Sequence, residues 1–193
     1  MILASTNKGK ISEMRQILEP LGIDLYSAID YPDLTDIKET GLTFKENALL
    51  KAKETFRITG QPSLADDSGL EVDALKGEPG IYSARYAGPE SDDKKNVIKL
   101  LAELEPYQVF SERTARFRTV LAYVDQDNIY YFEGLCDGHI AKYPRGTSGF
   151  GYDPVFIPEG YKISFAEMNR EEKNKISHRG KAVKAFREFI QAR

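Results

Sequence analysis

Strand-like and helix-like segments alternate along the whole chain, and this alternation limits the possible folds more than any other feature. Short apolar runs at residues 1–4 and 63–65 are typical of strands, whereas residues 11–21 repeat apolar side chains at the three- and four-residue spacing of a helix. Strands interleaved with helices from end to end predict an α/β fold. The 193 residues contain no internal repeat or linker, so we expect one domain over residues 1–193.

Start and stop signals define further elements. Thr43 and Glu46 form a capping-box pattern, which predicts the start of a helix. Alternating side chains after Arg113 predict a β-hairpin. Helices are expected to end at Gly22 and at Gly60, a further helix to run from a cap at Ser91 to near Pro106, and an amphipathic helix to follow Ser177. The hairpin is expected over 113–140 with its turn at 125–128. Further strands are expected at 23–26 and 154–157, and a loop over 77–89.

The charge balance limits the partners that the chain can bind. It has 27 Lys and Arg against 30 Asp and Glu, a formal net charge of −3. A broad nucleic-acid footprint needs a net basic face, so we expect no nucleic-acid partner. A small phosphate ligand is still compatible with this balance, because it needs only a few basic side chains in one place.

Cysteine content and hydropathy indicate the cellular compartment. The lone Cys136 has no partner for an intramolecular disulfide, which favours a reducing environment. It lies in an apolar run, where a packed thiol is expected rather than a nucleophile. No stretch has the pattern of a signal peptide or the length of a transmembrane helix. We therefore expect a cytoplasmic protein with no membrane partner.

Four polar segments interrupt the periodic pattern where strands end or helices begin, which is where α/β folds place ligands. The first, residues 5–10, joins a predicted strand to a predicted helix, so its amides and lysines can face an anion. The spacing nearly matches a phosphate-binding P-loop, but Ala4 stands at the first glycine position and Ile11 at the final Ser/Thr position. The segment disfavours a P-loop and fits either an anion site or a helix cap with solvated lysines.

The second segment, residues 66–69, carries the adjacent carboxylates of Asp66 and Asp67, which repel each other unless a cation offsets their charge. Mg²⁺ is the usual partner, because it prefers one or two carboxylates together with phosphate oxygens. Neighbouring side chains on a strand point to opposite faces, so only one of the pair is expected to face a ligand. The alternative is an Asx-turn before Gly69.

The third segment, residues 146–153, combines three glycines with Phe150, Tyr152 and Asp153. Glycines let the backbone approach a flat ligand, and an aromatic ring lets that ligand stack. The alternative is a flexible loop with an aromatic plug.

The fourth segment, residues 173–179, ends with a histidine and an arginine in the first turn of a predicted helix, where cations are unfavourable. A broken local rule often marks a functional site, and Lys173 begins this segment. Two further residues are candidates: Glu39 as an additional carboxylate, and Lys51 as a phosphate contact. A solvated surface lysine is the more common situation for a residue placed like Lys51.

Five stretches add a further pattern, in order from one end of the chain to the other. They are STNKGK (5–10), ETGLTFKENALLKAK (39–53), LADDSGLEVDALKGEPGIYSARYAG (64–88), GTSGFGYDPVFIP (146–158) and KISHRGKA (175–182). With these stretches the chain closely resembles the inosine triphosphate pyrophosphatase family. The resemblance implies an elongated mixed β-sheet flanked by helices, two lobes around a central nucleotide-binding cleft, and a homodimer.

The resemblance also implies an activity and a set of site residues. The substrate would be a non-standard purine nucleoside triphosphate (ITP, dITP or XTP), hydrolysed with Mg²⁺ to the monophosphate and pyrophosphate and so removed from the nucleotide pool. Asp67 would be the catalytic base and a metal ligand, with Asp66 and Glu39 as further metal ligands. The implied substrate-binding residues are Ser5, Thr6, Asn7, Lys8, Gly9, Lys10, Lys51, Ser68, Phe150, Gly151, Tyr152, Asp153, Lys173, His178 and Arg179.

One position departs from the family pattern, because some relatives place a metal-binding acid one residue before Glu39, where this chain has Lys38. Either Glu39 serves, or the metal relies on the aspartates and water. Two other functions stay open: a pyrophosphatase for pyrimidine or modified nucleotides, and a nucleotide-binding module without catalysis. The paired aspartates argue against the second, because a pure sensor has little reason to keep an acidic pair beside polyphosphate.

Overall fold

The computed structural model describes residues 1–34, 37–126 and 128–193. These residues form a six-stranded sheet in the order β2-β1-β3-β4-β5-β6, with one α-helix in each of the first three connections between strands and two more after β6. The strands are β1 (Ile2–Leu3), β2 (Tyr26–Ser27), β3 (Ser63–Val72), β4 (Thr114–Val124), β5 (Ile129–Ile140) and β6 (Phe156–Pro158). The α-helices are α1 (Lys8–Leu18), α2 (Phe44–Thr59), α3 (Asp93–Glu103), α4 (Arg170–Ile176) and α5 (His178–Gln191). The expected mixed α/β fold is confirmed.

Contacts within the chain divide it into two compact units. The first unit comprises Met1–Asp67, Thr119–Gly134 and Arg179–Arg193, and the second comprises Ser68–Arg118 and Leu135–His178. Each unit is built from separate stretches of sequence, and β3, β4 and β5 each contribute residues to both.

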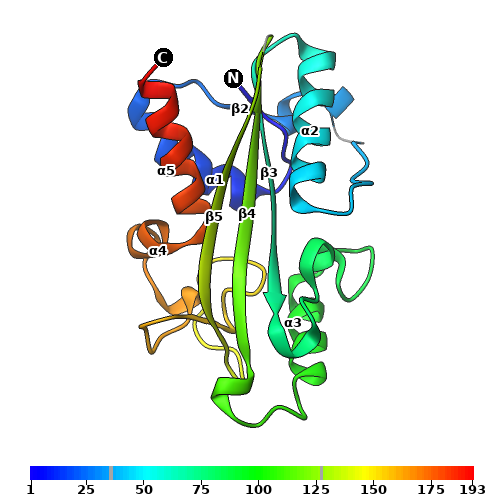
Figure 1. Cartoon of the computed structure of the whole chain (residues 1–193), viewed down its shortest axis with the longest axis vertical. Helices are drawn as coiled ribbons and strands as arrows, with labels where there is room; N and C mark the ends of the chain where they lie inside the picture. The colour runs from blue at the N-terminus through cyan, green and yellow to red at the C-terminus, as the bar shows by residue number, and fades with distance from the viewer. Residues whose placement is uncertain (35–36, 127) are drawn as a thin grey trace. The chain divides into compact units, whose positions relative to one another are not determined.

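Parallel strands form the framework of the first unit. Ile2 of β1 lies opposite Tyr26 of β2 and Ser63 of β3. Figure 1 shows α1 and α5 on one side of these strands and α2 on the other. The apolar sides of α1 and α5 share one core cluster with the strands, which includes Leu3, Met14, Leu18, Leu64, Leu121, Val183 and Phe186. A smaller cluster contains Ile2, Ala28 and Leu34.

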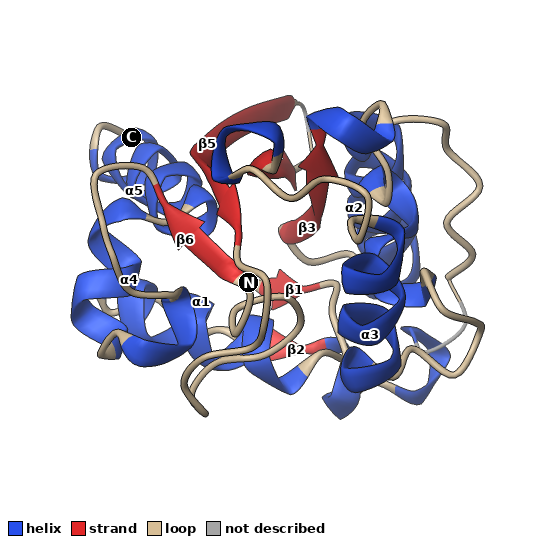
Figure 2. Ribbon diagram, turned by 90° about the horizontal axis from the view of Figure 1, so that it is seen from below, coloured by secondary structure: helices blue, strands red, loops and turns tan. Residues whose placement is uncertain are grey.

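Aromatic packing dominates the core of the second unit. The ring centroids of Phe117, Phe156 and Phe165 lie 4.6–6.0 Å apart. The short strand β6 (Figure 2) pairs antiparallel with β5. A Cβ at Gly138 of β5 would lie 2.3 Å from the carbonyl oxygen of Ile157, so glycine is required for this close approach of the two strands.

Helix ends follow the expected capping chemistry. The Asn7 side chain accepts a hydrogen bond from the Lys10 N–H at the start of α1, and Thr43 accepts one from the Glu46 N–H at the start of α2. Gly60 ends α2 in a left-handed conformation, with φ of 64°. None of the helices in the described ranges is long and apolar enough to cross a membrane.

The strand expected at residues 63–65 is longer than predicted. It continues through residues 66–69 to Val72, so the alternative of an Asx-turn before Gly69 is wrong. β3 lies between β1 and β4 in the sheet, and its acidic residues are tolerated there because cationic side chains neutralise them, as described below.

Other boundaries differ by a few residues. The cap of α3 is Asp92, whose side chain accepts from the Lys95 N–H, and Ser91 has a positive φ of 52°. A 3-10 helix, η5 (Gly80–Arg85), lies inside the expected loop. Helix α4 was not expected, because its seven residues include one apolar side chain and show no periodicity. The remaining shifts are β2 at Tyr26–Ser27 rather than 23–26, and β6 at Phe156–Pro158 rather than 154–157; Asp127 of the expected turn lies outside the described residues.

Candidate active site

Asp66 lies on β3 with its carboxylate fully buried among cations. Its Oδ2 accepts hydrogen bonds from Thr119 Oγ1 at 2.8 Å and from Arg179 Nε at 3.0 Å, and its Oδ1 forms an ion pair with Lys10. Burial opposes ionisation, but the charges of Arg179 and Lys10 outweigh it and hold the pKa of Asp66 well below its usual range. Asp66 is therefore ionised in the folded protein at neutral pH.

Asp67 has a different set of partners, as alternation along a strand requires. Its Oδ1 accepts a hydrogen bond from Lys51 Nζ at 3.0 Å, whereas its buried Oδ2 has no hydrogen-bond partner among the described residues. Burial raises the pKa of Asp67 above its usual value in spite of the opposing charge of Lys51. Two adjacent carboxylates with opposite pKa shifts are the pattern that separates a fixed anion from a group able to accept a proton.

Lys51 connects the acidic groups of this cluster. Its Nζ donates to Glu39 Oε1 at 2.6 Å, to Asp67 Oδ1 at 3.0 Å and to the Asp66 carbonyl oxygen at 2.8 Å. Burial alone would lower the pKa of Lys51, but the charges of Asp67 and Glu39 raise it. The expectation of a solvated surface lysine is wrong: Lys51 is 8% exposed and lies on the buried side of α2.

Two residues of the cluster carry no obvious signal in the sequence. Glu13 forms an ion pair with Arg179, which is 3% exposed, and Thr119 donates to Asp66 as described above. Glu13 lies three residues after Lys10 on α1, so a helical-face argument can place the two together. Buried side chains of β4 alternate with Arg116 and Arg118, and Thr119 is the polar side chain at one of these buried positions.

The segment 5–10 follows β1 and opens α1. Ser5 Oγ accepts from the Asn7 N–H at 3.2 Å, and Asn7 Oδ1 accepts from the Lys10 N–H at 3.0 Å. Thr6, Asn7 and Lys8 are exposed, and Gly9 and Lys10 are partly buried. This segment therefore contains both the Asn7 cap of α1 and a lysine, Lys10, that forms an ion pair with Asp66.

The second unit brings together most of the other predicted residues. Asp153 Oδ2 accepts from the Phe150 N–H at 2.9 Å and from Lys173 Nζ at 2.7 Å. The Lys173 ammonium also lies 5.1 Å from the centre of the Phe150 ring, a cation–π distance. A buried ion pair therefore fixes the loop that carries Phe150.

Three further predicted residues lie in the same unit. The Tyr152 hydroxyl donates to the Ser83 carbonyl oxygen at 2.8 Å, and Tyr152 is 4% exposed. His178 is buried, with its ring stacked on Phe117 at 4.6 Å. Ser68 is partly buried on β3.

The first unit contains the acids that were expected to hold a metal ion. The described part of the chain contains no group of three or more His, Cys, Asp or Glu side chains arranged to hold a metal ion. Two acids do share Lys51, namely Asp67 and Glu39, and the buried Asp67 Oδ2 lacks a hydrogen-bond partner within the described ranges. One or two carboxylates, completed by phosphate oxygens and water, are what Mg²⁺ prefers. Lys38, at the departing position, is exposed.

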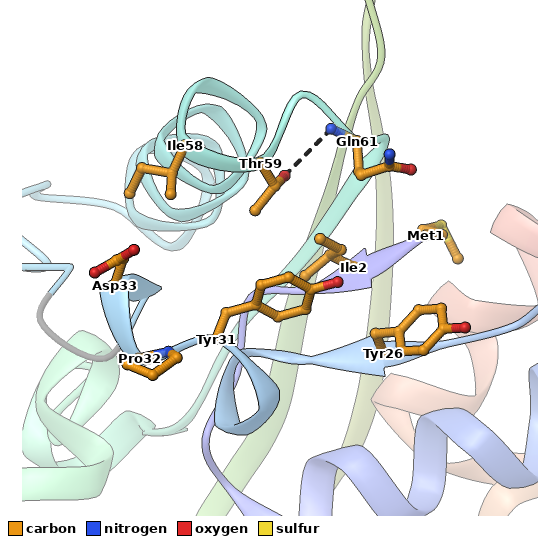
Figure 3. Close-up of a pocket in the computed structure, with 9 residues that line it drawn as sticks. All are labelled: Met1, Ile2, Tyr26, Tyr31, Pro32, Asp33, Ile58, Thr59 and Gln61. Carbon is orange, nitrogen blue, oxygen red and sulfur yellow. Dashed lines mark hydrogen bonds between the residues drawn. The ribbon is translucent and has the colours of Figure 1, made fainter.

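A separate hollow of about 550 Å³ lies near the amino ends of β1 and β2 (Figure 3). Its lining by described residues is part aromatic and part polar and includes the acidic Asp33: Met1, Ile2, Tyr26, Tyr31, Pro32, Asp33, Ile58, Thr59 and Gln61. Residues 5–10 follow the carboxyl end of β1 instead. None of the predicted site residues lines this hollow.

The fold is α/β, and its charged cluster contains a buried carboxyl group, Asp67, with a raised pKa. The sequence model of the Ham1 family matches residues 1–189. A dITP/XTP pyrophosphatase of Desulforamulus reducens is 48% identical over 191 residues, which cover 98% of this chain and 94% of that protein. A HAM1 protein structure from Coxiella burnetii matches with a TM-score of 0.89 and 39% identity, covering 100% of this chain and 98% of that one. The Staphylococcus aureus Ham1 structure matches with a TM-score of 0.87 and 38% identity, covering 99% and 97%.

The chain therefore belongs to the Ham1 family. This membership confirms the family resemblance found in its five motifs.

Proposed function

We propose that this protein hydrolyses the non-standard purine nucleoside triphosphates ITP, dITP and XTP to the monophosphate and pyrophosphate, with Mg²⁺ as cofactor, and so removes them from the nucleotide pool. Relatives from Desulforamulus reducens and Bacillus subtilis, named dITP/XTP pyrophosphatases, are 48% and 45% identical to it over nearly its whole length. The observation that carries the chemistry is Asp67, a buried carboxylate with a raised pKa and one oxygen left without a hydrogen-bond partner in the described structure.

The metal ligands proposed are Asp67 and Glu39, with Asp66 as a third candidate. Both oxygens of Asp66 already contact cations, Lys10 on one side and Arg179 on the other, which favours the first two acids. When bound, Mg²⁺ supplies positive charge to the phosphate oxygens. Lys51 lies between Glu39 and Asp67 and is suited to move its ammonium onto a phosphate.

The hydrolytic step follows from the protonation states of the two aspartates. Asp67 accepts a proton from the water that attacks the α-phosphorus, and the bond to pyrophosphate breaks. Lys10 and Lys51 bind phosphate oxygens and limit the motion of the triphosphate during the attack of water. Asp66 stays ionised and holds Lys10 and Arg179 in place.

Base selection is proposed for residues of the second unit. Phe150 stacks on the purine, and donors such as His178 and the loop amides bind its 6-keto oxygen, which accepts hydrogen bonds. A 6-amino group in that position places donor against donor, at a cost of about 1–3 kcal/mol for each unpaired group. The remaining proposed substrate contacts are Ser5, Thr6, Asn7, Lys8, Gly9, Ser68, Gly151, Tyr152, Asp153, Lys173 and Arg179.

A product assay on a substrate panel tests this function. Purified protein with Mg²⁺ is given ITP, XTP, GTP, ATP or a pyrimidine triphosphate, and pyrophosphate and monophosphate are measured. We expect fast release from ITP and XTP and slow release from GTP and ATP. Equal rates on all five substrates would contradict the base selection, and orthophosphate as the product would contradict attack at the α-phosphorus.

A further inference from the structure

Two consecutive residues of the loop at 146–153 are held from outside the loop. The Gly151 N–H donates to Asp93 Oδ2 at 2.8 Å, and the Tyr152 hydroxyl donates to the Ser83 carbonyl oxygen at 2.8 Å. Phe150 comes directly before these two residues. Gly149 and Gly151 on either side of Phe150 have left-handed φ values of 79° and 59°, so the backbone turns sharply around it. A contact at Gly151 therefore helps set the direction of the Phe150 ring.

Asp93 and Ser83 belong to elements that are joined to each other. Asn96 of α3 donates from Nδ2 to the Ala84 carbonyl oxygen at 2.8 Å and accepts at Oδ1 from the Ala87 N–H at 2.7 Å. Asn96 is 2% exposed, so these bonds are shielded from water. Helix α3 and η5 thus form one support, and the loop contacts this support at both Gly151 and Tyr152.

Helix capping does not account for the direction of the Asp93 carboxylate. The N-cap of α3 is Asp92, whose Oδ1 accepts from the Lys95 N–H at 3.0 Å. Asp93 is the first residue of α3, where an acid is favourable to the helix dipole whichever way it points. Its Oδ2 instead accepts from a loop residue 58 positions further along the chain.

We propose that Asp93 is a positioning residue for base recognition: by accepting the Gly151 N–H, it holds the loop so that Phe150 meets the purine. The inference rests on the proposed function, since it needs Phe150 to contact the base. Asp93 does not touch the substrate in this role, and it acts through Gly151. It serves binding in the ground state and the transition state alike, so its loss affects KM and leaves kcat unchanged.

Three variants separate positioning from helix stability. Asp93→Ala removes the acceptor, and we expect the KM for ITP to rise about tenfold while kcat stays within about twofold of the wild-type value. Asp92→Ala is the matched control, because it removes the cap of the same helix and keeps the loop contact; it should lower the melting temperature and leave KM unchanged. Asp93→Asn keeps an acceptor oxygen and should restore KM to within about twofold.

Hydrogen exchange supplies a readout that needs no activity. In the unliganded protein, NMR should show the Gly151 amide exchanging about tenfold faster in Asp93→Ala than in the wild type or in Asp92→Ala. An unchanged KM in Asp93→Ala, an equal rise in Asp92→Ala, or an unchanged Gly151 exchange rate overturns the inference. If the wild type fails to hydrolyse ITP, the proposed function fails by itself. The Gly151 exchange rate then still decides whether Asp93 holds the loop.

Discussion

The two adjacent aspartates have opposite pKa shifts because burial and nearby cations balance differently at each of them. Asp66 contacts Arg179 and Lys10, whose positive charges lower its pKa in spite of its burial. Burial raises the pKa of Asp67, and the charge of Lys51 offsets only part of that effect. The sequence predicts the pair and its need for positive charge, but the partners come from distant positions: Arg179 is 113 residues from Asp66. Thr119 and Glu13 contact Asp66 and Arg179 across 53 and 166 residues, and no local motif reveals these two contacts.

Replacing Asp66 by asparagine should destabilise the protein by about 3–5 kcal/mol at pH 7, because it leaves buried cations with less compensation. An unperturbed aspartate has a pKa of 3.8, and the pKa of Asp66 in the folded protein is well below that value. The stability that it contributes is therefore present above pH about 3.8 and is lost as the pH falls through the lower folded value. Urea unfolding at pH 7, 5 and 3.5 measures the free energy of unfolding of both proteins. The difference in this free energy between Asp66→Asn and the wild type should shrink only at the lowest pH.

Asp73→Asn is the matched control for this experiment. Asp73 pairs with Arg116 at 2.6 Å, but both side chains are more than a third exposed. An exposed pair contributes little, so we expect a change below about 1 kcal/mol. A difference between Asp66→Asn and the wild type that does not vary with pH would contradict the role assigned to the Asp66 charge.

Replacing Asp67 by asparagine should reduce kcat on ITP by about 10²–10⁴-fold, because the variant has no base to accept the proton of water. The same change should not lower stability, since burial already disfavours the ionised form of Asp67. Steady-state rates and thermal melts of the two proteins measure both effects. A kcat close to that of the wild type would remove Asp67 from the reaction.

Among the elements, those with capping residues and a long apolar period were predictable. The helices α1, α2 and α5 and the hairpin β4–β5 match their patterns. The exceptions have physical causes. β3 continues through an acidic stretch because distant cations neutralise it, and α4 depends on the Asn169 cap, whose side chain accepts from the Glu172 N–H, rather than on an apolar face.

The loop between β5 and β6 should lose its present conformation if Gly149 is replaced by a residue with a side chain. A Cβ there would lie 2.0 Å from Asp153 Oδ2, the atom that binds both Phe150 and Lys173. With left-handed backbone strain added to this clash, Gly149→Ala should cost about 2–4 kcal/mol in the free energy of unfolding and raise the KM for ITP. Urea unfolding and steady-state kinetics measure the two effects.

Gly160→Ala is the control for the loop experiment. Gly160 has a similar φ of 82°, but a Cβ there would meet no atom within 4 Å. It should cost only the strain, about 1–2 kcal/mol, with KM unchanged. Equal losses in the two variants would show that the contact with Asp153 does not matter.

For the molecule as a whole, the five motifs in order were enough to predict the family, which the relatives confirm. The mixed sheet was predictable from alternating periods. The division into two units made of interleaved stretches was not visible in any local pattern, because it depends on which distant segments pack together. The expected homodimer stays a prediction, for which a solution mass measurement is the test.

Binding of Mg²⁺ should stabilise the folded chain, by about 2.7 kcal/mol at a concentration 100-fold above its Kd. Glu39→Gln should weaken this gain, because it removes one proposed ligand. Glu54→Gln, on the outer side of α2 in an ion pair with the exposed Arg57, is the control and should keep the full gain. Thermal melts with and without Mg²⁺ measure it, and an equal gain in both variants would exclude Glu39 from the metal site.

The ion pairs of Arg179 have a consequence for biosynthesis. Asp66 and Glu13 are translated first, and the arginine that compensates them follows 113 and 166 residues later in the chain. Until Arg179 has been synthesised, the nascent chain holds the carboxylates of Asp66 and Glu13 without this arginine. The charged cluster can be completed only after Arg179 has been synthesised, so a product that terminates before Arg179 lacks both of these ion pairs.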